Sequence, residues 1–179
     1  EEDRLWFTKL IIELLSRHFE ISLEHDTIFK TELPLLFGDF IKFGVILSER
    51  IYEEIIDIKK LRGTLEAYLE QHNMDQGPSK EMNLVFFPDF ISHISRLARV
   101  LRGPRGNSLL LGVSGCGKRS VTRLAASMME YKCVELEISK TYGVPEFRED
   151  LKKFFSIAGL QDKPVVFMLN DNQIVHEEF

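Results

Sequence analysis

A glycine-rich segment at residues 112–120, Gly-Val-Ser-Gly-Cys-Gly-Lys-Arg-Ser, contains the residue types that bind a phosphate group. An apolar run precedes it at 109–111 and an amphipathic segment follows at 121–128, which is the strand–loop–helix context that such a loop needs. Glycines let consecutive backbone N–H groups face one anion, and the next helix adds its unpaired N-terminal N–H groups. The pattern predicts a nucleotide-phosphate site formed by Gly112, Val113, Ser114, Gly115, Cys116, Gly117, Lys118, Arg119 and Ser120.

This segment departs from the usual phosphate-loop pattern at one position. The residue after the lysine is normally Ser or Thr, whose hydroxyl ligates Mg²⁺, but here it is Arg119. Ser120 comes one residue late, which on a helix is a rotation of about 100°. Ser120 is therefore a poor substitute as a metal ligand. The alternative is a relic loop that keeps the turn but has lost its ligand.

The second candidate for chemistry is the pair Asn170 and Asp171, which follows the apolar run at 165–169. In a working nucleotide site, the first residue of such a pair is a carboxylate that holds Mg²⁺, and the second orients or deprotonates the attacking water. Asn170 has no negative charge to offer the metal, so Asp171 is left as the one candidate catalytic carboxylate. Arg119 and Asn170 both depart from the usual pattern at positions that bind Mg²⁺. We therefore expect bound ATP or ADP with weak or absent hydrolysis, and the sequence does not decide whether Mg²⁺ is bound.

These residues require an α/β arrangement to position them. We expect parallel strands at about 109–111, 134–138 and 165–169, with helices on both faces. Helices are predicted from Pro88 to Gly103, from the loop to residue 128, and from Pro145 to Gly159. Arg96, Arg99, Arg102 and Arg105 recur at every third residue, either as a solvated basic face or as a contact with phosphate or an acidic neighbour.

The first part of the chain is predicted to be helical and to lack chemistry. Helical spacing indicates one helix near the start and a second over about 57–72, joined by a connector around 22–39. Phe37, Phe40 and Phe43 are read as core contacts rather than as an aromatic binding stripe. Gly77-Pro78-Ser79 provides the best boundary, so we divide the chain into a helical segment, 1–79, and a phosphate-loop segment, 80–179.

Composition narrows the class of protein. The 179 residues include 44% hydrophobic ones, which favours a packed core, and the net charge of −5 gives no support for nucleic-acid binding. No apolar run is long enough for a membrane span, and the acidic start is not a signal peptide. The two cysteines have neither metal-ligand spacing nor a disulfide framework, which fits a reducing intracellular compartment.

Several segments together resemble the motor region of axonemal dynein heavy chains. The resemblance covers nearly the whole chain, from the end of the third AAA+ module into the first half of the fourth. It is carried by residues 2–7, 36–40, 82–86, 91–96, 112–125, 137–143, 148–153 and 166–174. A serine displaced by one position after the lysine, like Ser120, is itself common in this module of axonemal dyneins.

The resemblance implies a piece of a ciliary, ATP-driven microtubule motor in the cytoplasm and the axoneme of a cilium or flagellum. Its partners would be the neighbouring AAA+ modules, a microtubule bound through a stalk outside this segment, and intermediate and light chains bound by other regions. The fourth module is similar to a regulatory site that binds nucleotide and turns it over slowly or not at all. The alternatives are a structural ring segment that binds no nucleotide, a competent ATPase, and a phosphate loop from an unrelated signalling ATPase.

The resemblance also implies a truncated AAA+ parallel sheet. The family's sheet order is fifth, first, fourth, third, second, so a gap should separate the strand at 109–111 from the one at 165–169. The sensor strand, arginine finger, lid and stalk would lie beyond Phe179. AAA+ modules place the adenine near the equivalent of Leu84 and Val85, although ordinary core packing explains the same residues.

Overall fold

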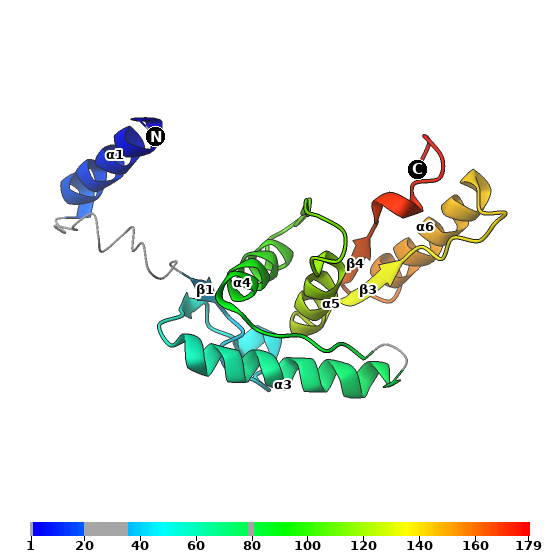
Figure 1. The fold of residues 1–179 in the computed structure, drawn as a ribbon, viewed down its shortest axis with the longest axis horizontal. Coiled ribbons are helices and arrows are strands. Elements are labelled where there is room, and N and C mark those ends of the chain that lie inside the picture. Colours follow the sequence, from blue (N-terminus) through cyan, green and yellow to red (C-terminus); the bar gives the residue numbers. More distant parts are fainter. Residues whose placement is uncertain (1, 20–35, 79–80) are drawn as a thin grey trace.

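The computed structural model describes residues 2–19, 36–78 and 81–179, and Figure 1 shows their arrangement. The elements before the phosphate loop are α1 (Glu2–Phe19), β1 (Phe37–Gly38), the 3-10 helix η1 (Leu47–Glu49), β2 (Glu53–Glu54), α3 (Ile58–Gln76) and α4 (Pro88–Arg102). Those after it are α5 (Lys118–Met128), β3 (Lys132–Glu135), α6 (Val144–Gly159), β4 (Val165–Met168) and the 3-10 helix η3 (Asp171–Gln173).

Local signals explain where the central helices begin and end. Asp57 caps α3, because its carboxylate accepts hydrogen bonds from the backbone N–H groups of Lys59 and Lys60 at 2.9 and 3.0 Å. Pro88 lies at the first turn of α4, and α4 ends before Gly103 as predicted. The predicted helix over 57–72 exists but continues to Gln76.

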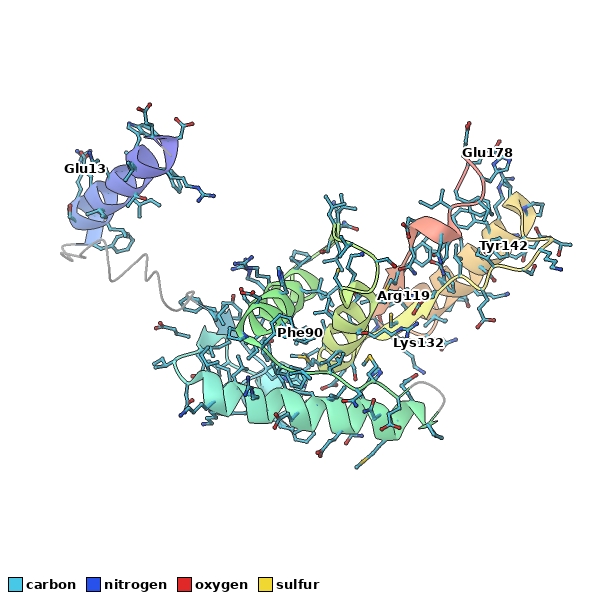
Figure 2. The ribbon with its side chains drawn as sticks, in the orientation of Figure 1. Glu13, Phe90, Arg119, Lys132, Tyr142 and Glu178 are labelled. Atoms are coloured by element: carbon cyan, nitrogen blue, oxygen red, sulfur yellow. The ribbon has the colours of Figure 1, made fainter. Side chains whose placement is uncertain are left out.

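The helices α3, α4 and α5 share one hydrophobic core (Figures 1 and 2). Leu61 and Leu65 of α3 and Ile94 of α4 are completely buried, as is Leu124 of α5. Helical spacing places these side chains on one face of each helix. The core thus attaches the phosphate-loop helix to elements on both sides of Gly77.

The upstream segment contains two short strands, β1 and β2, which its prediction as helices joined by a connector did not include. β1 pairs antiparallel with β2, with Phe37 opposite Glu54. Of the three phenylalanines predicted as core, only Phe40 is buried, while Phe37 and Phe43 are 40% and 46% exposed. Phe43 instead packs edge-on against Tyr68, with ring centroids 4.9 Å apart.

The strands β3 and β4 pair in parallel, with Lys132 opposite Val165 and Glu135 opposite Met168. The helix α6 connects them, as a parallel pair requires. They are the predicted second and third strands, found as neighbours, although β3 lies nearer the N-terminus than the predicted 134–138. The prediction of a parallel α/β sheet is therefore confirmed for these two strands.

The predicted strand at 109–111 is not formed, which is the main correction to the expected fold. Leu109 and Leu111 are 83% and 84% exposed, and the segment has no strand assignment. A strand exists only where a neighbour completes its hydrogen bonds. Between this segment and β4 lies a cleft of about 890 Å³, with Leu109 and Leu110 on one side and Val165, Val166 and Phe167 on the other.

The helix α1 lies apart from the remaining elements in Figure 1, and none of its described residues is buried. The predicted connector at 22–39 falls largely on residues 20–35, outside the described residues. Among the described residues, no helix combines the length and the apolar character needed to cross a membrane.

The arginines of α4 follow both predicted interpretations, a solvated face and a contact with an acidic neighbour. Arg102 forms an ion pair with Asp39, whose side chain is 5% exposed, and its guanidinium lies 5.5 Å from the ring centroid of Tyr52. Arg96 and Arg99 are exposed. Contact with an acidic neighbour is therefore correct for Arg102.

Candidate functional site: the glycine-rich loop and its cavity

Two glycines give the loop its shape. Gly115 and Gly117 have φ angles of +78° and +84°, in the left-handed region that side chains disfavour. Gly117 is also the residue before α5, so the helix begins immediately at Lys118. The free N–H groups of the first turn of α5 are thereby placed at the end of the loop, where they favour an anion.

Lys118 folds back over the loop that precedes it. Its ammonium group, Nζ, donates to the carbonyl oxygens of Gly112 at 2.7 Å and Val113 at 2.8 Å. The side chain of Cys116 is also near, with Sγ 3.8 Å from Nζ. The ammonium charge is therefore held at the loop where phosphate oxygens would bind.

The loop and the residues after β4 face one another across a cavity of about 360 Å³. The structure thus brings together both candidate regions identified in the sequence. Ser120 lines this cavity despite its displacement, while Val113 does not and is 78% exposed. The lining consists of Gly112, Ser114, Gly115, Cys116, Gly117, Lys118, Arg119, Ser120, Asn170, Asp171 and Asn172.

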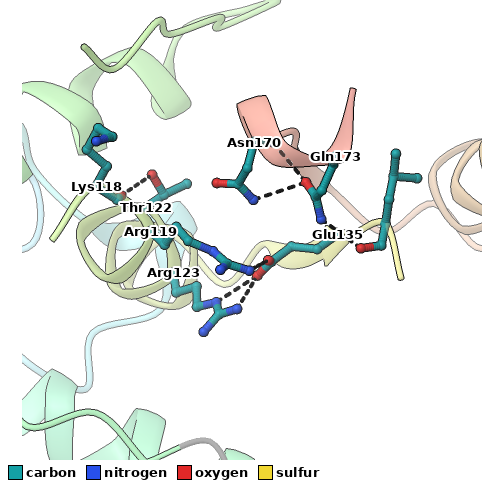
Figure 3. A network of polar contacts seen from close by, with 8 residues as sticks. Lys118, Arg119, Thr122, Arg123, Glu135, Asn170 and Gln173 are labelled. Atoms are coloured by element: carbon teal, nitrogen blue, oxygen red, sulfur yellow. Dashed lines mark hydrogen bonds and ion pairs between the residues drawn. The ribbon is translucent and has the colours of Figure 1, made fainter. Parts of the chain in front are cut away.

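Arg119 does not act as a substitute for the missing hydroxyl. Its guanidinium donates to Glu135 of β3 at 2.7 Å, and Arg123 donates to the other carboxylate oxygen at 2.7 Å (Figure 3). Burial of Glu135 favours its neutral form, but the hydrogen bonds from Arg119 and Arg123 outweigh burial and lower the pKa of Glu135. Arg119 therefore ties the start of α5 to β3.

Gln173 belongs to the site and was missed by the sequence analysis. Its oxygen, Oε1, accepts from the backbone N–H of Asn170 at 2.8 Å and from the Asn170 amide at 3.0 Å. Its own amide donates to the carbonyl of Leu136 at 2.7 Å, and its side chain is buried. The spacing of Asn170 and Gln173, three residues apart as in a capping box, was the available signal.

Asp171 begins η3 and is exposed at the rim of the cavity. Its carboxylate accepts from the backbone N–H of Asn172 at 3.0 Å. No group of three or more His, Cys, Asp or Glu suited to a metal ion occurs in the part of the chain that the structure describes. A catalytic role for Asp171 and metal ligation by Ser120 remain predictions.

The residues predicted to contact adenine lie away from the loop cavity. Leu84 packs against the core and Val85 is 77% exposed, and neither lines the cavity. A second cavity, of about 470 Å³, lies between α4 and the loop. Its lining includes Phe90, Leu111 and Val121 as well as Lys118, so it offers apolar surface directly beside the loop.

Comparison with known proteins identifies the family to which the chain is similar. The family described as "P-loop containing dynein motor region D4" matches residues 82–179. The chain is 46% identical to dynein axonemal heavy chain 6 of Homo sapiens over 178 residues, which is 99% of this chain and 4% of that protein. It is 42% identical to dynein axonemal heavy chain 1 of Mus musculus, over 100% of this chain and 4% of that protein.

A third relative is a flagellar inner-arm dynein heavy chain. The chain is 40% identical to the "Dynein-1-beta heavy chain, flagellar inner arm I1 complex" of Chlamydomonas reinhardtii, over 99% of this chain and 4% of that protein. The chain thus spans about 4% of the length of each curated relative named here. Because the family match covers more than half of the chain and includes the glycine-rich loop, the chain belongs to the family of P-loop-containing dynein motor regions D4.

Proposed function

We propose that this region binds ATP or ADP at the loop cavity and hydrolyses it weakly or not at all. The proposal is supported by one observation: the glycine-rich loop, Lys118 and the Asn170–Asp171 pair line the same cavity. Backbone N–H groups and an ammonium charge bind phosphates without a metal. The residues present therefore fit a nucleotide phosphate chain.

The fit to Mg²⁺ is weaker and explains the second half of the proposal. At the two positions where a metal ligand is expected, the cavity offers the neutral oxygens of Ser120 and Asn170, and Arg119 is committed to Glu135. When bound, Mg²⁺ would neutralise charge that develops during phosphoryl transfer. Without a carboxylate at position 170, this chain holds that ion less firmly, so hydrolysis suffers more than binding.

The whole protein is proposed to be a microtubule-based motor of the axoneme. This proposal is supported by the relatives, whose names describe axonemal dynein heavy chains and a flagellar inner-arm complex. Within such a motor, the region would act as a regulatory nucleotide site between neighbouring AAA+ modules. The proposed division at residues 79 and 80 would separate it from the preceding module.

A structural ring segment without nucleotide is the second candidate. The observation in its favour is that the ammonium of Lys118 is already satisfied by the carbonyls of Gly112 and Val113. A loop that binds its own lysine needs no ligand to keep its shape. Phosphate binding requires Nζ to exchange these partners for phosphate oxygens, which a charge-assisted hydrogen bond favours.

The substitution Lys118→Ala tests the two candidates in the intact heavy chain. We expect nucleotide density at this loop in electron cryomicroscopy of the unmodified chain, and its loss or marked reduction in Lys118→Ala. Lys132→Ala is the matched control, because Lys132 is exposed on β3 and outside the cavity. An empty loop in the unmodified chain at saturating nucleotide would favour the structural segment.

A further inference from the structure

The orientation of the Gln173 side chain is fixed by the backbone carbonyl of Leu136, the residue that follows β3. The amide nitrogen of Gln173 donates to the carbonyl oxygen of Leu136, at 2.7 Å, and a carbonyl oxygen can only accept. The Gln173 oxygen must therefore face the opposite way. Both residues are buried, with 6% of Gln173 and 4% of Leu136 exposed, so water does not offer an alternative partner.

The orientation of Gln173 also fixes the orientation of the Asn170 side-chain amide. The Gln173 oxygen accepts from the Asn170 backbone N–H at 2.8 Å and from the Asn170 side-chain amide at 3.0 Å. A flipped Asn170 would bring its own oxygen against the Gln173 oxygen, which places two acceptors together. The NH₂ group of Asn170 is thereby held toward Gln173.

The remaining atom of the Asn170 amide, Oδ1, faces the other side. Figure 3 shows it turned from Gln173 toward α5, and Asn170 lines the cavity that the glycine-rich loop encloses. The cavity consequently receives an uncharged acceptor from Asn170 rather than a donor. An acceptor suits a cation or its bound water, whereas a donor would suit a phosphate oxygen.

We propose that Gln173 is a positioning residue that aims the Asn170 amide oxygen at a water ligand of Mg²⁺ in a bound Mg²⁺–nucleotide. The inference rests on the proposed nucleotide binding and assigns its metal dependence to a residue outside the loop. Mg²⁺ keeps several waters when it binds to proteins, and an amide oxygen accepts from them. The site would thus retain part of the metal affinity that a carboxylate at position 170 would provide.

Two substitutions separate positioning from simple support. Gln173→Met removes both the acceptor for Asn170 and the donor to Leu136. Gln173→Glu keeps an acceptor for Asn170 and, in the neutral form that burial favours, an O–H donor for the carbonyl oxygen of Leu136. Gln161→Met is the matched control, since Gln161 is an exposed glutamine outside the cavity.

The measurement is the affinity of the intact heavy chain for the fluorescent nucleotide mant-ADP, with Mg²⁺ and with EDTA. Binding that Lys118→Ala abolishes is assigned to this site. For the unmodified chain we expect Mg²⁺ to strengthen binding about 2- to 12-fold, the range of one neutral hydrogen bond. Gln173→Met should lose this enhancement without weakening binding in EDTA, while Gln173→Glu and Gln161→Met should keep it.

Other outcomes overturn the inference in distinguishable ways. Equal affinity with Mg²⁺ and EDTA in the unmodified chain contradicts the inference but leaves nucleotide binding standing. If Gln173→Met and Gln173→Glu lose the Mg²⁺ enhancement of mant-ADP affinity equally, Gln173 only supports the fold. The same conclusion follows if Gln173→Met lowers the mant-ADP affinity in EDTA. Absence of any binding that depends on Lys118 contradicts the proposed function and the inference together.

Discussion

At the scale of single residues, Arg119 alters the candidate site in two ways. It removes the hydroxyl expected after the lysine, and it adds a hydrogen bond from the first turn of α5 to Glu135, which also binds Arg123. One carboxylate thus accepts from two guanidinium groups that are one helical turn apart. Compared with the usual phosphate loop, the site lacks the hydroxyl that would ligate a metal ion, and it has a hydrogen bond that connects α5 to β3.

The two cysteines are predicted to react very differently. Burial raises the pKa of the Cys133 thiol to about 11, and the nearby Glu135 carboxylate adds to this effect. The thiolate is the reactive form, so at pH 8 Cys133 should resist alkylation and should gain reactivity only as the pH approaches 11. Cys116 is exposed and lines the loop cavity, so it should react first, and nucleotide should protect it.

Mass spectrometry of iodoacetamide-treated intact heavy chain measures both reactions. Cys133 is the internal control for nucleotide protection, because it lies outside the cavity lining. Labelling of Cys133 as fast as that of Cys116 at pH 8 would contradict the burial argument. Cys116 labelling that ignores saturating nucleotide would contradict phosphate binding at the loop.

At the scale of elements, sequence signals predict what is locally determined. Pro88, Gly117 and Gly159 mark the start of α4, the start of α5 and the end of α6, because each acts on its own backbone. The glycine-rich loop and the Asn170–Asp171 pair could be predicted from the sequence, because each is recognised from a few consecutive residues that follow an apolar run. These features needed no knowledge of distant neighbours.

Features that depend on distant partners were missed or wrong. The segment 109–111 has a strand composition but no neighbouring strand within residues 2–19, 36–78 and 81–179, and Gln173 acquires its role from Leu136, 37 residues away. Nothing close to Arg119 in the sequence indicates that it binds Glu135, 16 residues away. Tertiary contacts decide such cases, and a single sequence does not display them.

The cleft beside residues 109–111 predicts that another strand completes the sheet in the intact heavy chain. Its apolar sides, Leu109 and Leu110 opposite Val165 and Phe167, suit the two faces of an inserted strand. We expect the backbone amides of 109–111 to exchange hydrogen for deuterium more slowly in the intact chain than in the isolated 179-residue chain. Equally fast exchange in both would contradict an inserted strand.

At the scale of the whole molecule, Arg50 connects the upstream segment to the phosphate-loop helix. Its side chain is 3% exposed and donates to the carbonyls of Val45 at 2.9 Å and Met128 at 2.7 Å. It also binds Glu130 at 3.0 Å, and its guanidinium lies 5.9 Å from the Tyr68 ring centroid. Because Met128 is the last residue of α5, Arg50 satisfies a free carbonyl at that helix end.

The substitution Arg50→Met should loosen this connection. It leaves the carbonyls of Val45 and Met128 without their donor, at a cost of about 2–6 kcal/mol for two unsatisfied acceptors. Hydrogen exchange in the intact heavy chain should show lower protection at the C-terminal end of α5. Arg99→Met is the control, because Arg99 is exposed on α4. Unchanged protection in Arg50→Met would contradict the proposed link.

We propose that this site binds nucleotide but scarcely hydrolyses it. The proposal can be tested by electron cryomicroscopy of the intact heavy chain, frozen after incubation with Mg²⁺–ATP and a system that keeps ADP low. We expect an intact triphosphate at the loop, beside Lys118. ADP formed there at about 1 s⁻¹ or faster, as in working ATPases, would contradict the proposal, and so would an empty loop.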